Sequence, residues 1–162
     1  MRGKLKDALN NIDMMYSELV EIANKIIDIY TKDVDELINK AYENVENLTM
    51  ENIRTLITKL SMKSYMFGDV KEKSSLKADC AEILKKEAYA IEFNKADGNN
   101  AIKENTATLE ISDEIVSNAI YDLVASLFKT KLDEIHRVTD SLKSVLVSRM
   151  QEMKLSSSTF EG

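Results

Sequence analysis

Apolar residues recur along the chain at intervals of three and four, the spacing that places side chains on one side of an α-helix with about 3.6 residues per turn. The longest such stretch is residues 109–153, which contain neither Gly nor Pro, and Thr108 before it is a candidate N-cap. At 1.5 Å per residue this helix would be roughly 65–70 Å long, longer than a compact domain of this size is wide. We therefore expect it to need partners along its length, from the rest of the chain or from other copies.

Residues 4–47 predict an N-terminal helical arm, because their apolar positions step by four and three in a heptad pattern. A second line of apolar residues at seven-residue steps widens this stripe: Ala8, Met15, Ile22 and Ile29. A stripe this wide favours contact with more than one neighbour, in a bundle core or an oligomer interface. Asp33 and Glu36 have capping-box spacing, so the pattern leaves open whether the helix continues or breaks at residues 31–33.

Residues 50–96 predict a helical hairpin. Thr49 is a suitable N-cap for its first helix, with Asn52 three residues later. Gly68 stands where a left-handed glycine would end that helix, and a short polar connection over residues 69–74 would follow.

The second helix of the hairpin is predicted over residues 75–96, ending at Asp97 and Gly98. Its apolar residues are expected to face inward: Leu76, Cys80, Ile83, Leu84, Ala88 and Ile91. Residues 97–107 lack strong apolar periodicity and predict a loop, and residues 156–162 predict a disordered tail.

Composition fixes the fold class. The 162 residues include no Pro and four Gly, too few turn residues for a β-rich or α/β fold. We predict an all-α protein, an elongated and coiled-coil-like helical bundle in one domain over residues 1–155. The wide N-terminal stripe and the long C-terminal helix present more apolar surface than one chain readily covers, which predicts a homo-oligomer. The expected interface residues are Leu9, Ile12, Tyr16, Leu19, Ile26, Leu142 and Val145.

The sequence carries no pattern of a secreted or membrane protein. Cys80 is the single cysteine, so no disulfide within the chain is possible and nothing indicates an oxidising compartment. The N-terminus lacks the apolar core of a signal peptide, and no apolar run approaches the length of a membrane span. We expect a soluble cytoplasmic protein without membrane contact.

Chemistry-bearing motifs are missing from the sequence. His136 is the single histidine, and Asp133 and Asp140 at helical spacing around it are more typical of a solvated surface than of a metal site. The sequence also lacks a Gly-rich phosphate loop, an ordered Ser/His/Asp set and a Cys/His cluster. We therefore predict a protein that is not an enzyme and has no metal, cofactor or small-molecule substrate.

Charge is unevenly distributed around the net value of −6, because residues 54–86 hold 8 basic and 4 acidic residues, a local balance of +4. This block is either an anion-binding patch or the solvated face of two helices. Single-stranded nucleic acid is held by cations along its backbone and by aromatic rings that stack on its bases. The candidate nucleic-acid-binding residues are Lys59, Lys63, Tyr65, Lys71, Lys73 and Lys77. Tyr65 and Phe67 are alternatively core anchors at a helix end.

The element order resembles that of the phage UvsY-type recombination mediators. The resemblance rests on Tyr65-x-x-Gly68, a charged helix and a closing helix that ends SLKSVLVSRMQEM, and it covers roughly residues 50–155. It implies a small helical protein that forms a ring-like homo-oligomer, binds single-stranded DNA and helps to load a recombinase onto DNA coated with single-strand-binding protein.

Two functional hypotheses follow. The first is a phage-encoded, non-enzymatic single-stranded-DNA-binding accessory protein of recombination or replication, acting as a homo-oligomer in the bacterial cytoplasm with a recombinase as partner. The second is a helical interaction or structural protein whose apolar stripes bind another protein, either a virion component or a host defence or replication factor. In the second case its acidic ends would imitate nucleic acid toward a basic partner.

Overall fold

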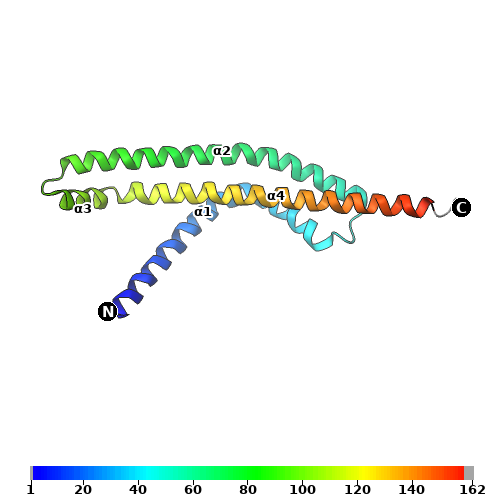
Figure 1. Cartoon of the computed structure of the whole chain (residues 1–162), viewed down its shortest axis with the longest axis horizontal. Helices are drawn as coiled ribbons and strands as arrows, with labels where there is room; N and C mark the ends of the chain where they lie inside the picture. Colours follow the sequence, from blue (N-terminus) through cyan, green and yellow to red (C-terminus); the bar gives the residue numbers. More distant parts are fainter. Residues whose placement is uncertain (1, 159–162) are drawn as a thin grey trace. The chain divides into compact units, whose positions relative to one another are not determined.

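A computed structural model of the chain describes the backbone of residues 2–158 and the side chains of residues 13–43 and 45–156. Over these residues the elements are α1 (Arg2–Asn44), α2 (Met50–Lys95), α3 (Asn100–Glu110) and α4 (Ser112–Ser158), with no strand (Figure 1). The all-α prediction is confirmed. Within the same range, no helix combines the length and the apolar run that crossing a membrane requires.

Helix α1 continues without a break through residues 31–33, the point that the sequence pattern left open. Thr31 and Val34, which stand before and after residues 32–33 in the sequence, are 2% and 0% exposed. Their packing holds this turn of the helix in place. Asp33 does not cap a new helix, and its carboxylate instead accepts a hydrogen bond of 3.0 Å from Lys63 Nζ on α2.

The connection between α1 and α2 is held from two directions. Thr49 caps α2 as predicted, because its Oγ1 accepts a hydrogen bond of 3.1 Å from the Asn52 N–H. The Arg149 guanidinium on α4 donates to three backbone carbonyls of the connection, those of Val45 at 2.8 Å, Glu46 at 3.0 Å and Leu48. Carbonyls at the end of a helix lack partners within that helix, so a charged side chain bound to them fixes the course of the turn.

The predicted helical hairpin over residues 50–96 is wrong, because α2 is one continuous helix through Gly68 and the expected polar connection. Gly68 is helical, and the positive φ expected of a helix-ending glycine is found at Gly98 (119°). A glycine inside a helix costs about 1 kcal/mol relative to alanine. Phe67 next to it is 3% exposed, and burying such a side chain contributes about 1.5–3 kcal/mol, which outweighs the glycine penalty.

The segment predicted as a loop over residues 97–107 instead forms most of α3. Asn99 caps this helix, since its Oδ1 accepts a hydrogen bond of 3.1 Å from the Ile102 N–H. Ala107 is fully buried and fixes the helix to its unit. The expected end of the preceding helix at Asp97 and Gly98 is confirmed, because α2 ends at Lys95 and Gly98 has positive φ.

The long C-terminal helix is present but begins at Ser112 and not at residue 109. Thr108 is not its N-cap, because the Thr108 hydroxyl donates to the Glu104 carbonyl at 2.8 Å inside α3. Ile111 separates the two helices and is 4% exposed. The helix continues to Ser158, so the first three residues of the expected disordered tail are helical, and residues 159–162 lie outside the described residues.

The chain groups into two compact units. The first unit contains Met1–Asp28 and Lys71–Phe128, and the second contains Ile29–Val70 and Lys129–Gly162. The prediction of one domain over residues 1–155 stays a prediction.

The core of the first unit includes alanines from α1, α2 and α3 and larger residues from α4. Its buried apolar residues are Ala23, Ile27, Ala78, Ala81, Ala107, Ile111, Val124 and Phe128. Lys85 Nζ on α2 donates to Asn118 Oδ1 on α4, and Asn118 Nδ2 donates in turn to Asp122 at 2.9 Å. This chain of hydrogen bonds satisfies the buried Asn118 amide and joins the two helices.

The second unit brings α1, α2 and α4 together around branched and aromatic side chains. Its buried apolar residues are Val34, Ile38, Ala41, Ile53, Leu56, Leu60, Phe67, Ile135, Val138 and Leu142. Lys131 on α4 donates to Asp35 on α1 at 2.8 Å and to Glu134 at 2.6 Å. Burial of the Lys131 ammonium opposes its charge, but these hydrogen bonds outweigh that effect and raise its pKa.

Candidate protein-interaction surface

In the first unit, α2 buries three small residues and exposes several large apolar ones. Ser74, Ala78 and Ala81 are at most 9% exposed. The apolar side chains on the other side are all more than half exposed: Leu76 at 64%, Ile83 at 55%, Leu84 at 61% and Ile91 at 52%. Cys80 lies among them and is also exposed. We call Leu76, Cys80, Ile83, Leu84 and Ile91 the α2 stripe.

The inward orientation predicted for the α2 stripe, Cys80 included, is therefore wrong. Apolar residues occur on both sides of this helix, and a 3.6-residue period does not say which side faces the chain's own core. Alanine and serine on the inner side let a neighbouring helix approach closely. The outcome is an exposed apolar surface, which soluble proteins typically use to bind another protein or chain.

Charged residues border the α2 stripe differently along its two edges. With about 100° per residue, Lys77 lies along one edge and Asp79 and Glu82 along the other, whereas the exposed Lys73 and Glu87 lie in line with the stripe itself. The Glu82 carboxylate forms an ion pair of 2.7 Å with the Lys86 ammonium on the same edge. The stripe thus has two lysines, Lys73 and Lys77, at its N-terminal end, a carboxylate, Glu87, in its middle and one edge of mixed charge.

A second apolar surface lies on α1 in the same unit. Met14, Met15 and Tyr16 are 55–62% exposed, and Ile22 is 42% exposed. Every described side chain from residue 13 to residue 18 is exposed, whichever direction it points around the helix. We call Met14, Met15, Tyr16, Leu19, Ile22 and Ile26 the α1 face.

The predicted oligomer-interface residues have different surroundings. Tyr16 is exposed, whereas Leu19, Ile26 and Val145 are half-buried. Leu9 and Ile12 lie outside the described side chains. The prediction for Leu142 is wrong, because Leu142 is 2% exposed and belongs to the core of its own unit.

Three of the predicted nucleic-acid-binding residues are in the second unit. Lys59 is exposed, whereas Lys63 is half-buried and forms an ion pair of 3.0 Å with Asp33. Tyr65 is 87% exposed, so it does not anchor the core. Phe67, which is 3% exposed, does. With about 100° per residue, Tyr65 lies about 120° around the helix from Lys59, so the ring and this cation do not share one face.

The other three predicted nucleic-acid-binding residues are in the first unit. Lys71 is half-buried and forms an ion pair of 2.7 Å with Glu72. Lys73 and Lys77 are exposed, one helical turn apart at the N-terminal end of the α2 stripe. Several of the predicted cations are therefore occupied by carboxylates or placed beside an apolar surface.

The second unit also has an open groove of about 910 Å³ between α2 and α4, lined by Tyr30, Tyr65, Met66, Asp69 and other residues. Ser64 Oγ and His136 Nε2 share a hydrogen bond of 2.7 Å at this groove. A serine–histidine pair needs free hydrogen-bond donors for a developing oxyanion before it is useful in acyl transfer. Both residues lie inside long helices, where backbone N–H groups are bonded within the helix. The hydrogen bond joins α2 to α4.

His136 is exposed, as expected of a surface histidine. Across the part of the chain that the structure describes, no group of three or more His, Cys, Asp or Glu residues is arranged to hold a metal ion. Sequence inspection missed the contact with Ser64 because the two residues are 72 positions apart.

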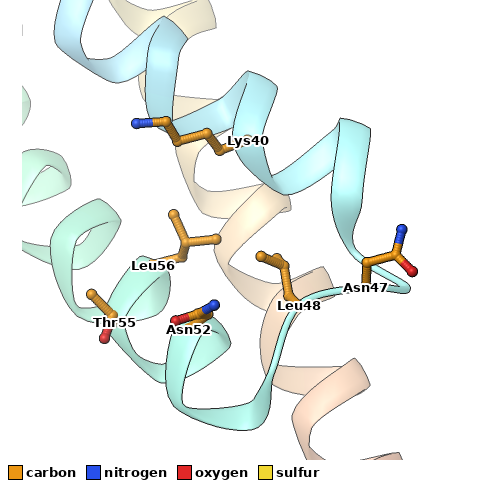
Figure 2. Close-up of a pocket in the computed structure, with 6 residues that line it drawn as sticks. All are labelled: Lys40, Asn47, Leu48, Asn52, Thr55 and Leu56. Atoms are coloured by element: carbon orange, nitrogen blue, oxygen red, sulfur yellow. The ribbon is translucent and has the colours of Figure 1, made fainter.

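A smaller open pocket of about 420 Å³ lies at the α1–α2 connection (Figure 2). Lys40 reaches it from α1, and Leu48, Asn52, Thr55 and Leu56 line it from the connection and the first turns of α2. It offers one ammonium group and three neutral polar side chains, those of Asn47, Asn52 and Thr55, around apolar atoms. This composition does not indicate a reaction.

Among the side chains that the structure describes, the α2 stripe and the α1 face are therefore two exposed apolar surfaces that a partner could cover. Both surfaces are long and apolar, which suits contact with another apolar helix. Comparison of the chain with models of known protein families, with curated proteins and with solved structures finds no match.

Proposed function

We propose that this protein is a non-enzymatic helical interaction protein that binds other α-helices, including those of its own copies, through the α2 stripe and the α1 face. The observation that carries this proposal is the burial pattern of α2, with Ala78 and Ala81 inside and Leu76, Ile83, Leu84 and Ile91 outside. A folded chain that leaves its larger apolar residues in water gains most by covering them with a partner.

The magnitudes are consistent with reversible assembly. Complete burial of one such side chain contributes about 1.5–3 kcal/mol, so covering four half-exposed ones contributes roughly 3–6 kcal/mol. A similar apolar surface on the partner doubles that figure. The loss of translational and rotational freedom on association costs about 4–15 kcal/mol. We therefore expect association that depends on protein concentration and uses more than one apolar surface.

Light scattering coupled to size exclusion tests the proposal. The expected result is a mass above the 18.4 kDa of one chain that rises with concentration. A mass of one chain at every concentration contradicts it.

Single-stranded-DNA binding is the second candidate function, and the observation that favours it is Tyr65. Its ring is 87% exposed on a helix that also carries the exposed Lys59, and an exposed ring is the group on which a base stacks. The role implied by the resemblance to UvsY-type mediators, loading a recombinase as a ring-like oligomer, is a proposal of the same kind. It ranks second because Lys63 and Lys71 are paired with carboxylates and Asp69 lines the groove beside Tyr65.

Replacing Tyr65 by alanine tests this second candidate. If bases stack on the ring, Tyr65→Ala should weaken binding of oligo-dT by about 1–3 kcal/mol, and binding of the wild type should weaken steeply with salt. Fluorescence anisotropy at two salt concentrations measures both effects. Tyr42→Ala is the matched control, because Tyr42 is 65% exposed on α1 in the same unit. Equal affinities for the two variants, or no binding at low salt, contradict the DNA hypothesis.

A further inference from the structure

The first unit contains two apolar surfaces of similar length that its own described residues leave uncovered. The α2 stripe extends from Leu76 to Ile91, which is about 22 Å along the helix axis at 1.5 Å per residue. The α1 face extends from Met14 to Ile26, about 18 Å by the same measure. One helix laid along the other would bring both surfaces into contact over most of their lengths.

Charge distinguishes between the possible pairings. Residues 13–28 of α1 carry four carboxylates and one lysine, a net charge of −3. Residues 71–95 of α2 carry six lysines and five carboxylates, a net charge of +1. Contact between two α1 faces would bring together two segments with a net charge of −3 each. Contact between two α2 stripes would bring together two segments with a net charge of +1 each. Contact of an α1 face with an α2 stripe is the pairing that joins unlike charges, and complementary charge selects partner and orientation more than it adds affinity.

The two lysines at the N-terminal end of the stripe give this attraction a location. Lys73 and Lys77 are exposed one turn apart beside Leu76 and Cys80. On α1, Glu18 is exposed beside Met15 and Ile22, at helical steps of three and four. Glu21 already pairs with Lys25 at 2.7 Å, so Glu18 is an acidic group beside the α1 face that remains available to a partner lysine.

We propose that the α1 face of one copy of this chain docks on the α2 stripe of a second copy. The proposal rests on the proposed function and specifies its partner. Each chain then offers one donor surface and one acceptor surface, so the interface is heterologous. Repetition of such a contact generates a ring when the rotation closes and a filament when it does not.

Cys80 provides a direct test because it lies within the α2 stripe and is the only cysteine of the chain. The experiment mixes the wild type with the variant Glu18→Cys/Cys80→Ser, whose only thiol is beside the α1 face, and adds a short bis-maleimide cross-linker. The variant keeps every apolar side chain of the α1 face, and complementary charge adds little affinity, so docking should persist without the Glu18 carboxylate. An affinity tag on one protein distinguishes the products by mass. The expected product is the cross-linked heterodimer of the two proteins, with no dimer when either protein is treated alone.

The matched control is Asn24→Cys/Cys80→Ser. Asn24 is exposed, but with about 100° per residue it lies on the opposite side of α1 from Met15. Its mixture with the wild type should give no heterodimer.

Other products overturn the proposal. A homodimer of the Glu18→Cys/Cys80→Ser variant alone shows that α1 faces pair with each other, and a dimer of the wild type alone shows that α2 stripes do. A link within one chain in the single variant Glu18→Cys shows that the α1 face covers its own α2 stripe. With any of these products and a mass above 18.4 kDa, the docking proposal fails while the proposed function stands. A mass of one chain at all concentrations removes both.

Discussion

Replacing Leu76 and Ile83 by serine is expected to convert the assembled protein into monomers of 18.4 kDa without loss of helix. These side chains are 64% and 55% exposed within one chain, so the substitutions remove little from its own core. In the assembly each loses roughly 0.75–1.5 kcal/mol of apolar burial, and together they raise the dissociation constant by a factor of about 10 to 150. Light scattering gives the mass, and far-ultraviolet circular dichroism gives the helix content.

The matched control is Val147→Ser/Met153→Ser in the second unit. These residues are 53% and 57% exposed on α4, so the control loses a comparable amount of exposed apolar surface. The control should keep the mass of the wild type. The account of the α2 stripe is wrong if the two double variants dissociate equally, or if the Leu76 and Ile83 variant stays assembled.

Replacing Phe128 by alanine is expected to lower the free energy of unfolding by about 3–5 kcal/mol. Phe128 is 1% exposed, is among the largest fully buried side chains, and lies in the core of the first unit, where alanines predominate on the facing helices. Urea denaturation followed by circular dichroism measures the change.

Phe93→Ala is the comparison of the same residue type. Phe93 is half-buried, stacks on Tyr89 with ring centroids 6.0 Å apart, and has the Lys103 ammonium 5.9 Å from its ring centre. Aromatic pairs and exposed cation–π contacts contribute about 0.5–1.5 kcal/mol each, so this variant should lose less stability than Phe128→Ala. A larger loss for Phe93→Ala contradicts the placement of the core.

Features set by neighbouring residues could be predicted from the sequence. The all-α class follows from the scarcity of Gly and Pro, and Thr49 is confirmed as a cap because its partner is Asn52, three residues away. Gly98 likewise follows the end of α2 with a positive φ. In each case the physical cause lies within one helical turn.

Features set by packing between helices could not be predicted from the sequence. Gly68 has the same local signal as Gly98, yet burial of Phe67 holds it inside α2. The α2 stripe and Cys80 were predicted to face inward because large apolar residues usually do, and only the structure shows that Ala78 and Ala81 take that side. A period of 3.6 residues identifies a face but not what covers it.

The candidate surfaces were predictable in part. The exposed line of Met15 and Ile22 on α1 is visible in the sequence as a second stripe at seven-residue steps. By contrast, the ion pair of Lys63 with Asp33 joins residues 30 positions apart, and local composition gave no sign that this cation is occupied. The contact of Ser64 with His136 was hidden for the same reason.

The mass of the protein in solution tests most directly whether its uncovered helix faces bind further copies of the chain. Light scattering coupled to size exclusion, repeated over a wide range of loading concentrations, gives that mass independently of molecular shape. The account predicts a mass of several chains that falls toward 18.4 kDa on dilution. A constant mass of 18.4 kDa across the whole range would contradict it.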